Sequence, residues 1–124
     1  HIKAGMPSHE AAMKCQPHMI ALAEAYVDRV TLAAFQKALR QDMPATAQTA
    51  LRTLYQLYAL HTIESHKGWY LESDYMLGVK TKAIRSEVDR LCAEARTWAN
   101  VYVEAFAIPN PLLGAAIVQS KDKS

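Results

Sequence analysis

The sequence predicts an all-α domain: an antiparallel up-down bundle of three long helices, with a short helical segment and a C-terminal arm. Glycine occurs only four times in 124 residues, whereas alanine, leucine and other good helix formers are frequent. Apolar residues recur with helical period along three long stretches joined by short connections. The length suits a single domain, which we place over residues 1–124.

The first helix is predicted over residues 8–39. Ser8 can cap its N-terminus, and Glu10 lies in the first turn, where the helix dipole favours an acid. Pro17 removes one backbone hydrogen bond, so we expect a kink there, or a short leading helix followed by a longer one. The apolar series has the spacing of a helix that buries one face: Met13, Met19, Leu22, Ala23, Tyr26, Val27, Val30, Ala33, Ala34 and Ala38.

The second helix is predicted over residues 45–67, after Pro44, which suits the start of a helix. Gly68 is expected to end it as a left-handed C-terminal cap. Its apolar residues cover two faces, as in a helix at the centre of a bundle. They are Leu51, Leu54, Tyr55, Leu57, Tyr58, Leu60 and Ile63.

Two further helical segments follow. Residues 69–77 are short and aromatic, and we expect one or two helical turns before Gly78. The third long helix is predicted over residues 80–106, roughly 40 Å at ~1.5 Å per residue. Its apolar stripe comprises Ile84, Val88, Leu91, Cys92, Ala95, Trp98, Ala99, Tyr102, Ala105 and Phe106.

The C-terminal arm begins at a corner made by two prolines around Asn110. Proline lacks an N–H and disfavours helical geometry in the preceding residue, so the helix must stop before this corner. The apolar residues that follow must be buried on something. The simpler interpretation is that the arm folds back on its own domain. The alternative is that it docks on another domain or subunit through a surface comprising Pro109, Pro111, Leu112, Leu113 and Ile117.

Charge and composition exclude several classes of partner. The net charge is only +2, and acids and bases alternate along the helices, so we expect no nucleic-acid partner. The apolar runs fall short of the ~20 residues that span a bilayer, so we expect no membrane partner.

Cys15 and Cys92 have no metal-binding spacing and are expected to be reduced core thiols. His1 does not look like a natural start, so an internal segment of an intracellular protein is expected.

No group of residues predicts catalysis or metal binding. His61 and His66 flank Glu64 at a spacing of five, whereas the histidines of a zinc helix stand four apart. Cys15 and His18 could touch as a thiolate–imidazole pair, but Pro17 lies between them and no third orienting group is evident. We therefore predict no catalytic, cofactor-binding or metal-binding residue in this chain.

Several strings resemble the C-terminal helical domain of the acyl-CoA oxidases, a domain that is also similar to the end of some bacterial acyl-CoA dehydrogenase-like proteins. The resemblance covers nearly the whole chain, and its motifs are packing motifs rather than catalytic ones. The strings are Gly5-Met6, Cys15-Gln16-x-His18, AYVDRVTLAAF over residues 25–35, LRTLYQLYAL over residues 51–60, and VEAFAIPNPLLGAAI over residues 103–117.

The resemblance implies that the chain is a fragment of a larger flavoenzyme of fatty-acid β-oxidation. In that family an FAD-dependent core precedes this domain and supplies the glutamate base that removes the α-proton of an acyl-CoA. The implied role of the chain is structural: it packs on the flavoprotein core of the same polypeptide and helps to form a homodimer, without binding FAD itself. The chain ends Lys121-Asp122-Lys123-Ser124 rather than in an SKL-type signal, so a cytoplasmic location is expected.

A different class of protein fits the same pattern. In the ligand-binding domain of a TetR-like transcriptional regulator, an aromatic face would line a pocket for a small apolar molecule. Here that face would comprise Tyr55, Tyr58, Trp98 and Tyr102. The sequence preceding this segment distinguishes the two hypotheses, because a regulator would have a helix-turn-helix there.

Overall fold

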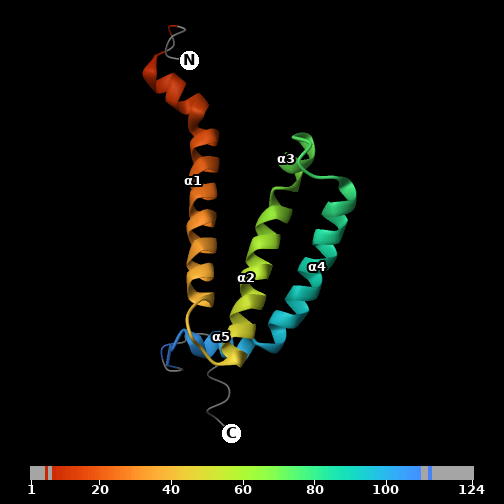
Figure 1. Cartoon of the computed structure of the whole chain (residues 1–124). Coiled ribbons are helices and arrows are strands. Elements are labelled where there is room, and N and C mark those ends of the chain that lie inside the picture. The colour runs from red at the N-terminus through yellow and green to blue at the C-terminus, as the bar shows by residue number, and fades with distance from the viewer. Residues whose placement is uncertain (1–4, 6, 110–111, 113–124) are drawn as a thin grey trace. The chain divides into compact units, whose positions relative to one another are not determined.

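A computed structural model describes residues 5, 7–109 and 112, and these residues form helices and turns without a strand. The all-α prediction is confirmed for this part of the chain. The contacts divide the chain into two compact units, residues 1–41 and residues 42–124. The three-helix bundle and the single domain over residues 1–124 remain predictions. The first unit contains α1 (Ser8–Leu39), and the second contains α2 (Ala45–Ser65), α3 (Lys67–Glu72), α4 (Gly78–Thr97) and α5 (Ala99–Ala105) (Figure 1).

Helix α1 has the predicted bounds but a different start. Pro7, with an extended backbone (φ −53°, ψ 140°), precedes the helix, and no side chain caps it. The predicted cap at Ser8 is therefore wrong, because Ser8 is already the first helical residue. Figure 1 shows the N-terminal part of α1 inclined to the rest, as expected for a helix that contains Pro17.

Helices α2 and α4 run antiparallel as a hairpin, and α3 lies at its tip (Figure 1). Helix α2 ends at Ser65 with His66 as its C-cap, and Gly68 lies inside α3. The predicted glycine cap is thus wrong, because the N–H of His66 already bonds to the carbonyl of Ile63 at 3.2 Å. The left-handed residue in this region is Asp74 (φ 57°), which follows Ser73, the C-cap of α3. Aspartate tolerates this conformation better than most residues.

The third predicted helix is divided in two at Trp98. This residue has φ −98° and ψ 6°, so α4 stops at Thr97 and α5 begins at Ala99. The continuous helix over residues 80–106 was therefore an incorrect prediction. The turn redirects α5, and the hydroxyl of Tyr102 then donates to the carbonyl oxygen of Ala50 at 2.7 Å. This hydrogen bond joins residues 52 positions apart in the sequence. It favours a chain that turns at Trp98 over one in which α4 continues straight through α5.

The core of the second unit lies between α2 and α4. Leu91 of α4 is its largest fully buried side chain, with 1% of its surface exposed. Val88 of the same helix and Ala50 of α2 are also buried. The small Ala50 allows the two helices to approach closely, and among the described residues of this unit the other buried ones, Thr53 and Glu64, are polar. A polar contact therefore helps to fix how these helices meet.

Candidate docking surfaces

The predicted docking surface at the C-terminal corner is only partly described. Helix α5 ends at Ala105, and Ala107 turns the chain with a left-handed backbone (φ 50°). Pro109 is exposed, and Leu112, whose N–H bonds to the carbonyl of Pro109 at 2.9 Å, is 75% exposed. Pro111, Leu113 and Ile117 lie outside the described residues, so the choice between an inward and an outward arm remains a prediction.

A second apolar surface lies on α1, where the sequence suggested buried positions. Met19, Leu22, Tyr26 and Val30 are 64, 73, 63 and 48% exposed. They are spaced by three, four and four residues, so they form one line along the helix, which we call the α1 stripe. The spacing did reveal the stripe, but it could not reveal whether this chain covers it.

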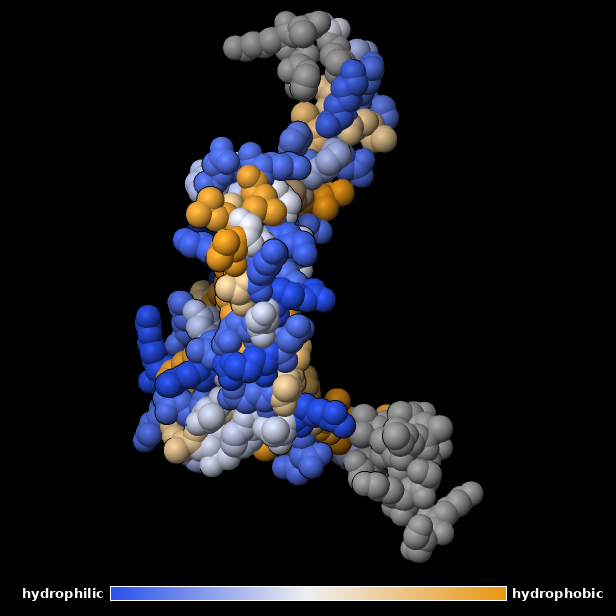
Figure 2. Space-filling view, turned by 90° about the vertical axis from the view of Figure 1, so that its right-hand side faces the viewer, coloured by the Kyte–Doolittle hydropathy of each residue, from blue (hydrophilic) through white to orange (hydrophobic). Residues whose placement is uncertain are grey.

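A third apolar group lies at the tip of the hairpin. The ring of Trp69 stacks on Tyr75, with centroids 5.5 Å apart, and meets Tyr70 edge-on at 5.2 Å. Trp69 is 58% and Tyr75 is 73% exposed. Figure 2 shows that hydrophilic side chains predominate over α4, the helix that this view faces. The rings of Trp69 and Tyr75 thus stack on each other at an exposed place beside a hydrophilic helix.

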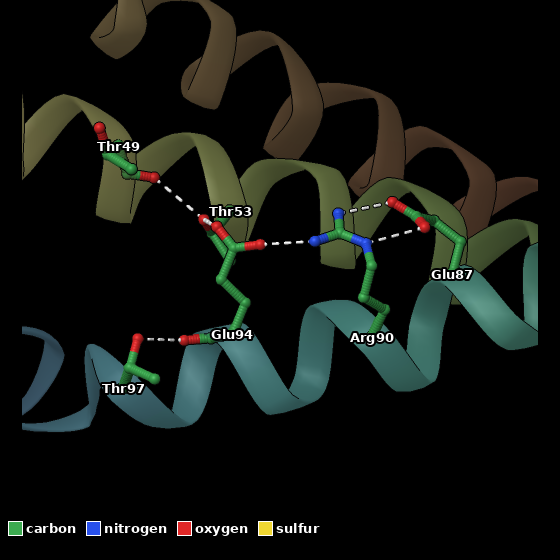
Figure 3. Close-up of polar contacts among 6 residues, drawn as sticks. All are labelled: Thr49, Thr53, Glu87, Arg90, Glu94 and Thr97. Atoms are coloured by element: carbon green, nitrogen blue, oxygen red, sulfur yellow. Dashed lines mark hydrogen bonds and ion pairs between the residues drawn. The ribbon is translucent and has the colours of Figure 1, made fainter.

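The polar contact between α2 and α4 centres on Glu94. The buried hydroxyl of Thr53 lies 2.8 Å from Glu94 Oε1 and 3.1 Å from the carbonyl oxygen of Thr49 (Figure 3). Arg90 Nη1 donates to the other carboxylate oxygen of Glu94 at 2.8 Å. Arg90 also donates through Nε and Nη2 to both carboxylate oxygens of Glu87, at 3.0 and 2.7 Å. The guanidinium thus joins two acids of its own helix, and one of these acids reaches α2.

This geometry shifts the titration of the acids. The Thr53 hydroxyl and then Arg90 hold the pKa of Glu94 below its ordinary value. Hydrogen bonding to Arg90 likewise lowers the pKa of Glu87. The two carboxylates in turn raise the pKa of Arg90, so the guanidinium stays charged. Sequence reasoning missed this group, although the spacing of Glu87, Arg90 and Glu94 by three and four residues is that of helical ion pairs.

A second ion pair joins α2 and α4 near the tip of the hairpin. Arg85 Nη1 lies 2.6 Å from Glu64 Oε1, and the Glu64 side chain is 9% exposed whereas that of Arg85 is 65% exposed. The hydrogen bond from Arg85 outweighs the effect of burial and lowers the pKa of Glu64. Glu64 was predicted to have no catalytic or metal-binding role. The structure places it in the contact between two helices.

The described residues form no arrangement that is typical of a metal or catalytic centre. No group of three His, Cys, Asp or Glu side chains in this part of the chain could hold a metal ion. Cys15 is half-buried and Cys92 is exposed, so Cys92 is not the core thiol that its apolar neighbours suggested. Tyr102, proposed for a ligand pocket, instead donates its hydroxyl to Ala50 of α2.

That this chain binds no flavin by itself remains a prediction. Gly5, Gly68 and Gly78 are too far apart in sequence to form one phosphate-binding loop. Within the described ranges, each buried side-chain nitrogen or oxygen has a hydrogen-bond partner. No described helix has the length and apolarity required to cross a bilayer.

Comparison with known proteins gives one consistent family. A family model described as acyl-CoA oxidase matches residues 1–121. The chain is 33% identical over 109 residues to the peroxisomal acyl-coenzyme A oxidase 2 of Arabidopsis thaliana. This alignment covers 88% of the chain and 16% of that protein. It is 31% identical over 96 residues to an acyl-coenzyme A oxidase-like protein of Mus musculus, covering 77% of the chain and 15% of that protein.

A third relative is the peroxisomal acyl-coenzyme A oxidase 1 of Mus musculus, 27% identical over 99 residues, with 80% of the chain and 15% of that protein covered. No solved structure matches. The chain thus spans about one sixth of the length of these relatives.

Proposed function

The chain belongs to the acyl-CoA oxidase family, and from this premise we propose that it is the C-terminal structural domain of an FAD-dependent enzyme of fatty-acid β-oxidation. One observation supports this above all: the family match covers residues 1–121, yet the matched region is only 15–16% of each relative. Most of such a polypeptide, including its reaction centre, would lie outside this chain. The family match does not favour the TetR-like alternative.

The proposed role is placement rather than chemistry. When bound to the core, FAD would accept the hydride that an acyl-CoA loses, and we expect the core, not this chain, to hold this cofactor. The second unit is a hairpin held together by the buried Leu91 and by the contacts of Glu94 and Glu64 across α2 and α4. Such a unit can present exposed apolar surfaces to a flavoprotein core and to a second subunit. Homodimer formation is part of this proposal.

The test compares the 124-residue chain with the full-length polypeptide, each purified separately. Absorption in the visible flavin bands should accompany the full-length protein and should bleach when an acyl-CoA is added without oxygen. The isolated chain should carry no flavin. Stoichiometric FAD on the isolated chain would contradict the structural role, and a full-length protein without flavin would contradict the proposed enzyme.

The subunit and location proposals need separate measurements. Light scattering of the full-length protein should give the mass of a dimer, and a monomer at all concentrations would contradict that part. A cytoplasmic location remains a prediction, and two of the relatives are named as peroxisomal. Imaging of the full-length protein fused to a fluorescent protein in its own host would distinguish the two locations.

A further inference from the structure

We propose that the joint between α4 and α5 is a hinge with two states. In the bent state, which the structure shows, α4 ends at Thr97 and α5 runs across the end of the hairpin opposite α3 (Figure 1). In the straight state, residues 78–105 form one helix that continues along α2. The hinge changes the direction in which the C-terminal corner, which begins at Pro109, leaves the hairpin. It thereby adds a movable joint to the structural role proposed for this domain.

The local sequence permits a continuous helix through the joint. Residues 95–102 read ARTWANVY and contain neither proline nor glycine, the two strongest helix breakers. The apolar spacing also passes through the joint without interruption, from Leu91 through Ala95 and Trp98 to Tyr102. The strong helix breakers therefore do not explain the bend, and its cause must lie in contacts made by side chains.

The bend leaves backbone groups without the partners that a straight helix provides. The first N–H groups of any helix lack an acceptor within that helix. In α5 these are the N–H groups of Ala99, Asn100 and Val101, whose acceptors in a straight helix would be the carbonyls of residues 95, 96 and 97. Straightening forms these hydrogen bonds, so the contacts that hold the bent state must outweigh them.

Two hydroxyl groups hold the bent state. Tyr102 Oη donates to the carbonyl oxygen of Ala50 on α2 at 2.7 Å. Thr97 Oγ1 donates to the carbonyl oxygen of Glu94 at 2.6 Å, in the last turn of α4 (Figure 3). Hydroxyl groups that bond to the preceding turn often bend a helix. Of these two bonds, only that of Tyr102 joins separate helices, so we call it the latch.

The register of α2 and α4 shows why the latch favours the bend. Thr53 meets Glu94, and because the helices are antiparallel, three residues back along α2 to Ala50 corresponds to three residues forward along α4, to residue 97. In a straight helix Tyr102 would lie about 7.5 Å beyond residue 97, alongside the first turn of α2. The bend brings Tyr102 back to Ala50. Helix α2 thus runs beside residue 102 in both states.

The experiment measures amide hydrogen exchange over residues 78–105 of the full-length protein, by mass spectrometry with fragmentation to single residues. The variant Tyr102→Phe removes the latch and keeps the ring. Tyr75→Phe is the matched control, because that tyrosine is 73% exposed and its ring stacks on Trp69 of α3, at the other end of the hairpin. Neither measurement requires a bound flavin.

We expect Tyr102→Phe to slow exchange at Ala99, Asn100 and Val101 about twofold or more, because the straight state gives their N–H groups acceptors. Exchange at the buried Leu91 should not change, which shows that the variant is folded. Unchanged exchange at residues 99–101 overturns the hinge. Faster exchange over residues 99–105 also overturns it, because α5 then frays instead of joining α4.

Two further comparisons complete the test. Slowing of the same size in Tyr75→Phe overturns the hinge, since that change leaves the latch intact. If Tyr102→Phe also loses protection at Leu91, Thr97→Ala takes its place, because it removes the other hydroxyl that holds the bend. Thr97→Ala should then slow exchange at residues 99–101, and unchanged or faster exchange there overturns the hinge.

Discussion

At the residue scale, Thr53 of α2 forms a side-chain hydrogen bond with Glu94 of α4. Its hydroxyl is buried, and its one hydrogen is shared between a carbonyl oxygen of its own helix and Glu94 of the other. Thr53→Val keeps the shape and removes the donor, so we expect a loss of about 1 kcal/mol in the free energy of unfolding, measured with urea. Thr49→Val is the control, because the exposed Thr49 hydroxyl bonds only within α2. Equal effects of the two changes would contradict a role across the helices.

The acids of the contact between α2 and α4, and Glu87 beside them on α4, predict a loss of stability in acid. Glu64, Glu87 and Glu94 have folded-state pKa values below 4.5, because each accepts hydrogen bonds from an arginine, and Glu94 also from Thr53. A lowered pKa stabilises the folded state above the unfolded value, and this contribution is lost as pH falls through the folded value. Arg85 and Arg90 stay charged throughout, because their pKa values are raised.

We therefore expect the urea midpoint to be steady from about pH 7 to 5 and to fall below about pH 4.5. The double variant Glu64→Gln, Glu94→Gln should be less stable at pH 7 and should lose less on acidification. Glu72→Gln, at an exposed acid of α3, is the control. The same acid-induced loss in the double variant and in the parent chain would show that other groups cause it.

At the scale of elements, the break between α4 and α5 depends on Tyr102. Its half-buried hydroxyl, whose pKa is raised by burial and by Glu94, donates to Ala50 of α2. Tyr102→Phe should cost about 1 kcal/mol of unfolding free energy, because the ring remains and only the hydrogen bond is lost. Tyr75→Phe is the matched control, since Tyr75 is 73% exposed. No difference between the two variants would mean that the bond does not hold α5.

The elements show which features local sequence can predict. The bounds of α1 follow from its helical period, although its start was predicted from a Ser8 cap that the helix does not use, and the start of α2 follows from Pro44. The break at Trp98 could not be predicted, because no proline or glycine stands there and its stabilising contact lies 52 residues away. The α1 stripe has the spacing of a core face, and periodicity alone cannot tell which part of a protein covers such a face.

At the scale of the whole molecule, the two units differ in where their stability originates. The contacts of Leu91, Glu94 and Tyr102 that hold the hairpin lie within residues 42–124. Helix α1 exposes its apolar stripe, although isolated helices in water are marginally stable without packing. We therefore expect residues 42–124 to fold without residues 1–41.

This expectation can be tested with two truncations and one pair of substitutions. Residues 42–124 should unfold cooperatively, and Leu91→Ala should cost about 2–5 kcal/mol both there and in the whole chain, because it leaves a cavity in the core. In the whole chain, Leu22→Ala should change stability by less than about 0.5 kcal/mol, because that leucine is exposed. Residues 1–41 alone should be only partly helical by circular dichroism. If residues 42–124 are unfolded while the whole chain is folded, α1 belongs to the same cooperative unit, and the single domain predicted over residues 1–124 is the better description.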